Sequence, residues 1–355
     1  MSESKLTRRQ FHQAAAAASV AATAAAAASK ARAADSSKIL SHNADMVYRR
    51  LGKTDLMVSA VCLGGHWKRV NIMDQDFDQN RREVVTRCLE RGINYVDACC
   101  RPEVCAYSKA LKGRRDQMYM ALSYCGHEVR NAEYRTAAKL MQSLDELLGM
   151  SDQEYTDLWR ITCFEPGGQH TFNTSCETVA ALEQAKKQGK ARHIGLSTHD
   201  RRWAKMMIEQ FPQIEVLLFP YTAKTKQIPD GDGPTGSKES LLEAVKTCDV
   251  GTFGIKPFAS NSIFKGNSAP DSPHAEEDDR RARLVLRYIL VNNEITAPIP
   301  GLISPQQVDN VAKAVTEYRT LDMAKEEKAE VDRIMDHAWA NLPPGYEWLR
   351  DWEYV

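Results

Sequence analysis

The chain has 355 residues, and its 47 Lys and Arg residues balance 47 Asp and Glu residues, so the formal net charge is zero. With no basic face apparent in the sequence, this balance argues against nucleic acid and anionic membranes as partners. The nine cysteines form no CxxC pair and no zinc-ribbon spacing, so we expect buried free thiols and no disulfide framework.

Residues 1–33 have the three parts of an export signal, in the right order. Residues 7–11 read TRRQF and resemble a twin-arginine motif, an alanine-rich stretch without charge covers 14–29, and the A-x-A pattern at 31–33 is typical of a cleavage site. We therefore expect a bacterial twin-arginine signal peptide at 1–33 and a linker at 34–45. The alternative is a helical alanine tail. The resemblance implies export of the folded protein by the twin-arginine machinery to the periplasm or the medium.

No later segment has about 18 uninterrupted apolar residues, so the sequence predicts no membrane span in the mature protein.

Beyond the linker, short β-rich segments alternate with helix-length amphipathic segments. The expected strands are 59–64, 94–98, 117–123, 156–163, 192–198, 214–220, 251–257 and 295–300. The expected helices are 79–91, 103–112, 132–149, 175–188, 200–210, 237–247, 278–292 and 304–316.

Eight strand–helix repeats in a chain of this size predict an α/β fold, a single-domain (β/α)8 TIM barrel over 46–338. No GxGxxG follows the first strand, which argues against a Rossmann sheet. An extra C-terminal helix is expected at 321–338. The tail at 339–355 is rich in aromatic residues and should pack on the barrel.

Several local signals mark element ends and loops. Asp200 should cap the fifth barrel helix, and Ser304 followed by Pro305 should begin the eighth. Gly149 is expected to end the third helix as a C-terminal cap. Residues 221–238 contain five Gly or Pro residues after the sixth strand and predict a long loop at the face where barrel active sites lie.

Several segments, in their order and spacing, together resemble the aldo/keto reductases over 46–338. The opening at 48–65 (YRRLGKTDLMVSAVCLGG) is similar to the hairpin and first strand of that family, and residues 92–98 (GINYVDA) are similar to its second strand, which ends in an aspartate. The same resemblance extends to KALKGRRDQ at 109–117, YTDLW at 155–159, RHIGLS at 192–197, GIKPFA at 254–259 and IPG at 299–301.

The resemblance implies an Asp-Tyr-Lys-His tetrad in which only Asp97 is matched. The Tyr slot falls at Pro102 or in a short deletion, the Lys slot at Ser123 and the His slot at Thr162. Tyr107 lies in the following helix, which argues against its replacing the missing Tyr. A buried carboxylate without a partner is costly, so Asp97 should have a new one. The candidates are Arg101 and Arg160.

On the cofactor side, the resemblance implies NAD or NADP, tightly bound if the protein is exported with it. The residues expected to contact the dinucleotide are Tyr221 at the nicotinamide ring, Ser197 and Thr198 at the carboxamide, Lys256 and Pro257 near the pyrophosphate, Ser304 at the last barrel helix, and Asn310 at the adenine. Basic residues that hold a 2′-phosphate in the family are missing from 302–307, which argues against a strong NADP preference.

The strand ends also predict a cluster of thiols and imidazoles at the barrel mouth. Its members are His66, Cys99, Cys100, Cys125, Cys163 and His199. Such side chains bind zinc or copper, and a thiol of this kind can act as a nucleophile. Semi-buried core cysteines are the favoured interpretation, and no metal is expected, because no ligand spacing supports one.

Three functions follow from these patterns. The first is hydride transfer between a nicotinamide dinucleotide and a carbonyl or alcohol, with a sugar as one candidate, in an altered active site where Asp97, His66 or His199 handles the proton. Trp67, Trp159 and Phe219 are the aromatic residues proposed to face a sugar. The second is a binding barrel that has lost the reaction. The third is a metal- or thiol-dependent enzyme at the same mouth.

Overall fold

The computed structural model describes residues 38–65, 76–163, 171–223, 238–267, 271–291, 293 and 295–351. The described residues from Leu40 onward belong to one compact unit. The expected signal peptide at 1–33 lies outside the described residues, as do His66, Trp67 and most of the expected loop at 221–238.

Seven parallel strands form one sheet in which each strand pairs with the next along the chain. They are β3 (Tyr95–Ala98), β4 (Tyr119–Leu122), β5 (Thr156–Thr162), β6 (Ala191–Ser197), β7 (Val216–Pro220), β8 (Gly251–Ile255) and β9 (Ala297–Pro298).

Residues 61–64 close the sheet into a barrel. Leu63 bridges to Val96 of β3 on one side, and Gly64 bridges to Gly301 beyond β9 on the other, both in the parallel sense. The backbone bond from Gly64 N–H to Pro300 O is 2.8 Å long. The predicted eight-stranded (β/α)8 barrel is thus confirmed, with its first strand reduced to isolated bridges.

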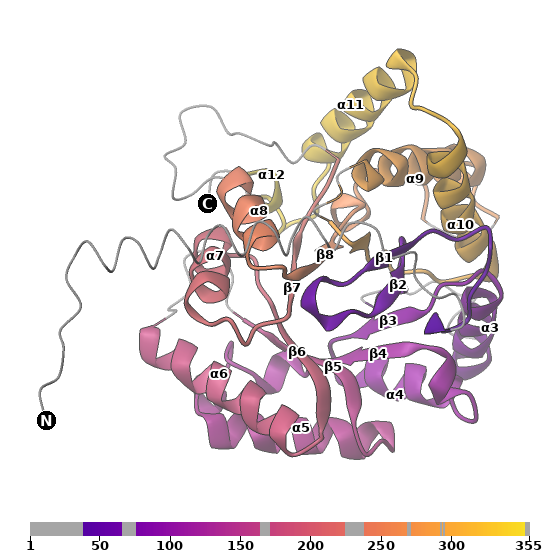
Figure 1. Cartoon of the computed structure of the whole chain (residues 1–355). Coiled ribbons are helices and arrows are strands. Elements are labelled where there is room, and N and C mark those ends of the chain that lie inside the picture. Colours follow the sequence, from indigo (N-terminus) through magenta and orange to yellow (C-terminus); the bar gives the residue numbers. More distant parts are fainter. Residues whose placement is uncertain are drawn as a thin grey trace, which may run out of the picture. The chain divides into compact units, whose positions relative to one another are not determined.

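One helix follows each strand of the barrel, and Figure 1 shows these helices around the outside of the strands. They are α3 (Phe77–Glu90), α4 (Arg101–Ala110), α5 (Ala137–Ser151), α6 (Phe172–Lys187), α7 (Arg201–Gln210), α8 (Lys238–Thr247), α9 (Ala275–Leu290) and α10 (Pro305–Thr320). Short 3-10 helices lie in the connections, η3 (Gly52–Thr54), η4 (Arg115–Gln117), η5 (Cys125–His127), η6 (Ala132–Tyr134) and η7 (Ala259–Asn261).

An antiparallel hairpin of β1 (Tyr48–Arg50) and β2 (Met57–Ser59) precedes the barrel and closes its N-terminal end. Leu51 and Val58 from this hairpin are fully buried in a cluster that also contains Tyr95 and Phe253 from inside the barrel. A second and larger hydrophobic cluster lies between the strands and the helices. Because side chains alternate along a strand, β3, β4, β5 and β7 each supply residues to both clusters.

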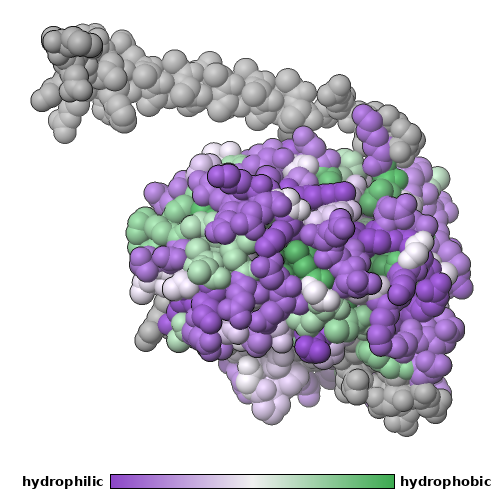
Figure 2. Space-filling view, turned by 90° about the horizontal axis from the view of Figure 1, so that it is seen from below, coloured by the Kyte–Doolittle hydropathy of each residue, from purple (hydrophilic) through white to green (hydrophobic). Residues whose placement is uncertain are grey.

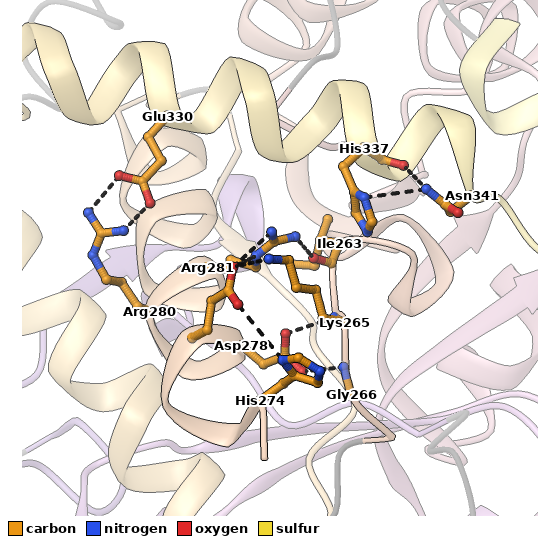
Figure 3. A network of polar contacts seen from close by, with 11 residues as sticks. Ile263, Lys265, Gly266, His274, Asp278, Arg280, Arg281, Glu330, His337 and Asn341 are labelled. Atoms are coloured by element: carbon orange, nitrogen blue, oxygen red, sulfur yellow. Dashed lines mark hydrogen bonds and ion pairs between the residues drawn. The ribbon is translucent and has the colours of Figure 1, made fainter. Parts of the chain in front are cut away.

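The extra C-terminal helix is α11 (Lys325–Ala340), and α12 (Trp348–Asp351) follows it. Figure 3 shows α11 joined to α9 by the ion pair between Arg280 and Glu330. A second ion pair joins the same helices, with Arg287 Nη1 2.7 Å from Glu327 Oε1. These contacts hold α11 against α9.

The caps expected at Asp200 and Ser304 are confirmed. The Asp200 carboxylate accepts from Trp203 N–H, and the Ser304 hydroxyl accepts from Gln307 N–H ahead of Pro305. The cap expected at Gly149 is wrong, because α5 continues past it to Ser151 and ends at Asp152, whose φ of 53° is left-handed. An Asp tolerates that conformation by local hydrogen bonding, which is why the Gly was a misleading signal.

Two expected helix starts are also corrected. Residues 132–134 form η6, and α5 begins only after Thr136, whose hydroxyl accepts from Lys139 N–H. The helix expected at 321–338 begins at Lys325.

Among the described residues, no helix is long and apolar enough to cross a membrane. Figure 2 shows one face of the molecule, on which hydrophilic residues predominate and hydrophobic residues form small groups between them.

Phe253→Ala should lower the free energy of unfolding by about 3–5 kcal/mol. The Phe253 side chain is fully buried inside the barrel, and its ring stacks on that of Tyr95 with the centroids 4.3 Å apart. Denaturant unfolding followed by circular dichroism measures this. The matched control is Phe172→Ala, whose side chain is exposed and which should cost less than about 1 kcal/mol. Equal losses in the two variants would contradict the assignment of Phe253 to the barrel interior.

Candidate active site

A cavity of about 450 Å³ opens at the C-terminal ends of the strands. Its walls include Asp97 from β3, Arg160 and Thr162 from β5, Ser197 from β6, and Lys256 directly after β8. Parallel strands deliver their last side chains to one rim, which is why residues far apart in the sequence meet here. The volume is in the range of small-molecule sites.

Asp97 and Arg160 form a buried ion pair in the wall of this cavity. Arg160 Nε donates to Asp97 Oδ1 at 2.9 Å, and Arg160 Nη2 donates to Asp97 Oδ2 at 2.5 Å. Only 9% of the Asp97 side chain and 3% of the Arg160 side chain are exposed. Of the two predicted partners, Arg160 is confirmed, whereas Arg101 begins α4 and is exposed.

Arg160 keeps its positive charge within this pair. Burial lowers the pKa of the Arg160 guanidinium, but the charge and hydrogen bonds of Asp97, together with Cys99 and Glu128, outweigh burial, and the pKa lies above its ordinary value. A two-pronged guanidinium–carboxylate contact also fixes the orientation of both groups. Arg160 therefore places on β5 a cationic charge that the resemblance implies at position 123, directly after β4.

A chain of hydrogen bonds runs from this pair away from the cavity. Arg160 Nη1 donates to Thr162 Oγ1 at 2.8 Å, and Thr162 Oγ1 lies 2.7 Å from Ser123 Oγ. Ser123 Oγ in turn donates to Glu128 Oε2 at 2.5 Å. The two positions that hold a Lys and a His in the family thus hold two hydroxyl groups that are bonded to each other.

Glu128 ends this chain and is fully buried just after η5. Its carboxylate accepts from the N–H groups of Thr162 and Tyr124 at 2.7 and 2.9 Å. Burial raises the pKa of Glu128, although these bonds and the charge of Arg160 oppose the increase. Sequence reasoning missed Glu128, because a single carboxylate in a polar connection belongs to no periodic pattern.

The missing Tyr is not replaced by Tyr107. The Tyr107 ring is fully buried, its hydroxyl donates to Gly64 O at 2.5 Å, and burial raises its pKa. Pro102 lies in the first turn of α4. The side chain that reaches the cavity from this turn is Glu103, which accepts from Cys99 N–H at 2.8 Å and which sequence reasoning also missed.

The segment after β8 forms another wall and has an unusual backbone. Lys256, Ala259, Ser260 and Asn261 all have φ between 47° and 70°, the left-handed region that is rare for residues other than Gly. Such strain is typical of ligand sites. Figure 3 shows how α9 holds the end of this segment, with the Asp278 carboxylate accepting from Gly266 N–H. Arg281 donates to Ile263 O, and Asp278 also accepts from Lys265 N–H.

Of the residues expected to contact a dinucleotide, Ser197, Lys256 and Pro257 line the cavity. The other four residues do not. Tyr221 is buried in the outer hydrophobic cluster, and the Thr198 hydroxyl accepts from Asp200 N–H. Ser304 caps α10, and the Asn310 side chain bonds Arg283 of α9 and the carbonyl oxygen of Asp279.

The thiol cluster predicted at the mouth is only partly present. Cys99 and Cys125 line the cavity, and Cys100 is the N-cap of α4. The placement of Cys163 at the rim is wrong, because its side chain faces the outer cluster, where burial raises its pKa. No group of three or more His, Cys, Asp or Glu residues within the described ranges could hold a metal ion.

Aromatic residues reach the cavity from the C-terminal tail. The Trp348 ring stacks on His199 with centroids 4.4 Å apart, and the Tyr346 ring lies 5.0 Å from Lys256 Nζ. All four residues line the cavity. The roles proposed for Trp159 and Phe219 are wrong, because both side chains are fully buried in the outer cluster.

Comparison with known proteins gives a consistent result. The family model described as the aldo/keto reductase family matches residues 61–283. L-galactose dehydrogenase from Arabidopsis thaliana is 25% identical over 314 residues, covering 81% of this chain and 94% of that protein. L-glyceraldehyde 3-phosphate reductase from Escherichia coli O157:H7 is 19% identical, and the match covers 84% of this chain and 94% of that protein.

Solved structures show the same fold. An aldo-keto reductase from Klebsiella pneumoniae in complex with NADPH superposes with a TM-score of 0.61 at 17% identity, covering 85% of this chain and 97% of that one. The holo form of aldo-keto reductase AKR11C1 from Bacillus halodurans has a TM-score of 0.59 at 20% identity, and the match covers 85% of this chain and 99% of that one.

Asp97→Asn should lower the free energy of unfolding by about 3–5 kcal/mol, because it leaves the buried guanidinium of Arg160 without its counter-charge. Chemical denaturation measures this. Asp249→Asn is the matched control at a half-exposed pair with Arg50, where the loss should be at most about 1 kcal/mol.

The double variant Asp97→Asn with Arg160→Met should be more stable than Asp97→Asn alone, because no charge is then left buried without a partner. Additive losses from the two substitutions would contradict the coupling between these side chains.

Proposed function

Because the chain belongs to the aldo/keto reductase family, we propose that it is an oxidoreductase that transfers hydride between a nicotinamide dinucleotide and a carbonyl or alcohol, in an altered active site. The observation that carries this proposal is the Asp97–Arg160 pair in the cavity wall. It retains the carboxylate that the resemblance implies and gives it a new cation in the cavity wall.

The walls of the cavity fit a nicotinamide dinucleotide, either NAD or NADP. Lys256 adds a cation to the strained segment after β8, where the resemblance implies the pyrophosphate, and Ser197 adds a hydroxyl at the end of β6. Oriented backbone amides and a cation are the groups that bind phosphates. When bound, the nicotinamide supplies the hydride chemistry. The comparison structure from Klebsiella pneumoniae, in complex with NADPH, supports this cofactor class.

Arg160 is the group that would act on the substrate oxygen. In either direction of the reaction, negative charge develops on that oxygen, and a fixed cation in a buried wall stabilises it without rearrangement. Asp97 then positions Arg160 and does not transfer a proton, because both of its oxygens are bonded to the guanidinium. His199 is stacked beneath Trp348 and would help to hold the tail at the cavity.

The substrate we propose is a hydroxylated compound such as a sugar. The cavity combines polar groups with the aromatic faces of Tyr346 and Trp348, which suit the apolar face of a sugar ring. Two relatives whose names refer to L-galactose and L-glyceraldehyde 3-phosphate support this class. They also make these two compounds the first substrates to test.

A binding protein without catalysis is the second candidate, and the loss of the proton-donating Tyr favours it. The metal- or thiol-dependent alternative is weaker, because Cys163 faces away from the cavity and the described residues assemble no ligand set.

The proposed location is outside the cytoplasm, after export by the twin-arginine pathway with the cofactor already bound. This rests on the order of paired arginines, apolar stretch and cleavage pattern in 1–33. Folding before export would let the chain bind a dinucleotide where that cofactor is abundant.

The double variant Arg8→Lys with Arg9→Lys should keep the protein in the cytoplasm at full length, because the export machinery reads the arginine pair. Fractionation of bacterial cells measures this by immunoblot. Lys30→Arg is the control and should still yield the shorter form in the periplasm. Normal export of the Arg8→Lys, Arg9→Lys variant would contradict the twin-arginine assignment.

Lys256→Ala should weaken dinucleotide binding about tenfold, or 1.4 kcal/mol, since it removes the cation beside the proposed pyrophosphate site. Fluorescence titration with NADH and with NADPH measures the dissociation constants. Lys187→Ala, at an exposed position on α6, is the control and should bind like the unmodified protein. If the unmodified protein binds neither NADH nor NADPH at millimolar concentration, the proposed function is ruled out.

A further inference from the structure

The hydroxyl groups of Thr162 and Ser123 join the cavity to a buried carboxyl group without a break. Thr162 lines the cavity, and Ser123 and Glu128 are fully buried behind it. The successive oxygen–oxygen distances are 2.7 Å from Thr162 to Ser123 and 2.5 Å from Ser123 to Glu128. Distances this short are typical of strong O–H···O hydrogen bonds.

Thr162 Oγ1 can form one further hydrogen bond, to a substrate, whether Glu128 is ionised or protonated. A hydroxyl has one proton to donate and two lone pairs. Arg160 Nη1 uses one lone pair, and Ser123 uses either the proton or the other lone pair. When Glu128 is ionised, the protons of Ser123 and Thr162 point toward it, and Thr162 keeps a lone pair that can accept from an alcohol.

When Glu128 is protonated, the chain reverses. Glu128 donates to Ser123, Ser123 donates to Thr162, and Thr162 has its own proton left to donate to an oxygen in the cavity. The same three groups can therefore take a proton from an alcohol or give one to an alkoxide. Arg160 stays a donor to Thr162 in both states, which keeps the hydroxyl in place.

We propose that Thr162 is the residue that exchanges the proton with the substrate, and that Ser123 and Glu128 act through it as a relay and a proton store. The inference rests on the proposed function. In the oxidation direction, the alcohol loses a hydride to the nicotinamide and its hydroxyl proton to Thr162 Oγ1. The Thr162 proton moves to Ser123 Oγ, and the Ser123 proton moves to Glu128 Oε2. The products are the carbonyl compound, the reduced cofactor and neutral Glu128.

The surroundings of Glu128 suit a group that changes its protonation state. Among the described residues, the charged and titratable groups that act on it from other elements are Arg160 on β5 and the thiol of Cys163 directly after that strand. Arg130 and His127 flank it on its own segment, and His127 is paired with Glu146 of α5. Because burial raises the pKa of Glu128, its proton can be held at a higher pH than in an exposed carboxyl group.

The test compares hydroxyl variants in the full chain with its cofactor. Thr162→Val and Ser123→Ala should each lower kcat for alcohol oxidation by about 100-fold or more without changing the dinucleotide dissociation constant, whereas Thr162→Ser should stay within about tenfold. In the unmodified protein, kcat should fall as the pH is lowered through the pKa of Glu128, since the carboxylate must be ionised to accept the proton. That dependence should disappear in Glu128→Gln.

Thr156→Val is the matched control, because Thr156 is a buried threonine on the same strand with its hydroxyl bonded to Met120 O at 2.7 Å, at the far end of the barrel. It should lose stability as Thr162→Val does and keep both kcat and its pH dependence. A Thr162→Val enzyme with normal kcat, or a Glu128→Gln enzyme with the unmodified pH dependence, would overturn the relay.

A second readout does not depend on turnover. The infrared band of the Glu128 carboxyl group, assigned by its loss in Glu128→Gln, should respond to a pH jump at least about tenfold more slowly in Ser123→Ala than in Thr156→Val. Equal rates would overturn the relay. A slow response in Ser123→Ala together with no dehydrogenase activity in any preparation would support the relay and count against the proposed function.

Discussion

The buried contact between Asp97 and Arg160 is the interaction on which the polar wall of the cavity depends. Two charges removed from water are tolerated only when each satisfies the other with good geometry, and here both carboxylate oxygens are bonded to the guanidinium. The pair fixes the position of one cation in the cavity wall. It also leaves a third guanidinium N–H, which holds Thr162 in place.

The hydrogen bond from Arg160 to Thr162 joins the ion pair to a wall of small polar side chains. A Lys and a His at positions 123 and 162 would occupy the space that two hydroxyls and the buried carboxyl of Glu128 share. In the mechanism that we propose, Arg160 is the cation, and a line of hydroxyls takes the place of the phenol and the ammonium group that the resemblance implies. The opposite wall differs in kind, because there the strained backbone after β8 is held by α9.

Much of the fold could be predicted because its signals are local. The strand–helix repeats, the caps at Asp200 and Ser304 and the need of Asp97 for a cationic partner all follow from short segments or from the cost of burying a charge. The errors have one main physical cause. On a strand buried on both faces, the apolar pattern does not show which alternate residues point inward, so Trp159 and Cys163 were assigned to the cavity although both face the helices.

By itself, the sequence predicted the barrel, the mismatch at three of the four tetrad positions that the resemblance implies, and the short list from which the partner of Asp97 came. Only the tertiary structure decided that Arg160 is that partner, that Glu128 is bonded to Ser123 and Thr162, and that the tail places Trp348 against His199. Local patterns are set by the period of a helix or strand. Contacts between side chains of different strands depend on the closure and register of the whole barrel, which no single segment records.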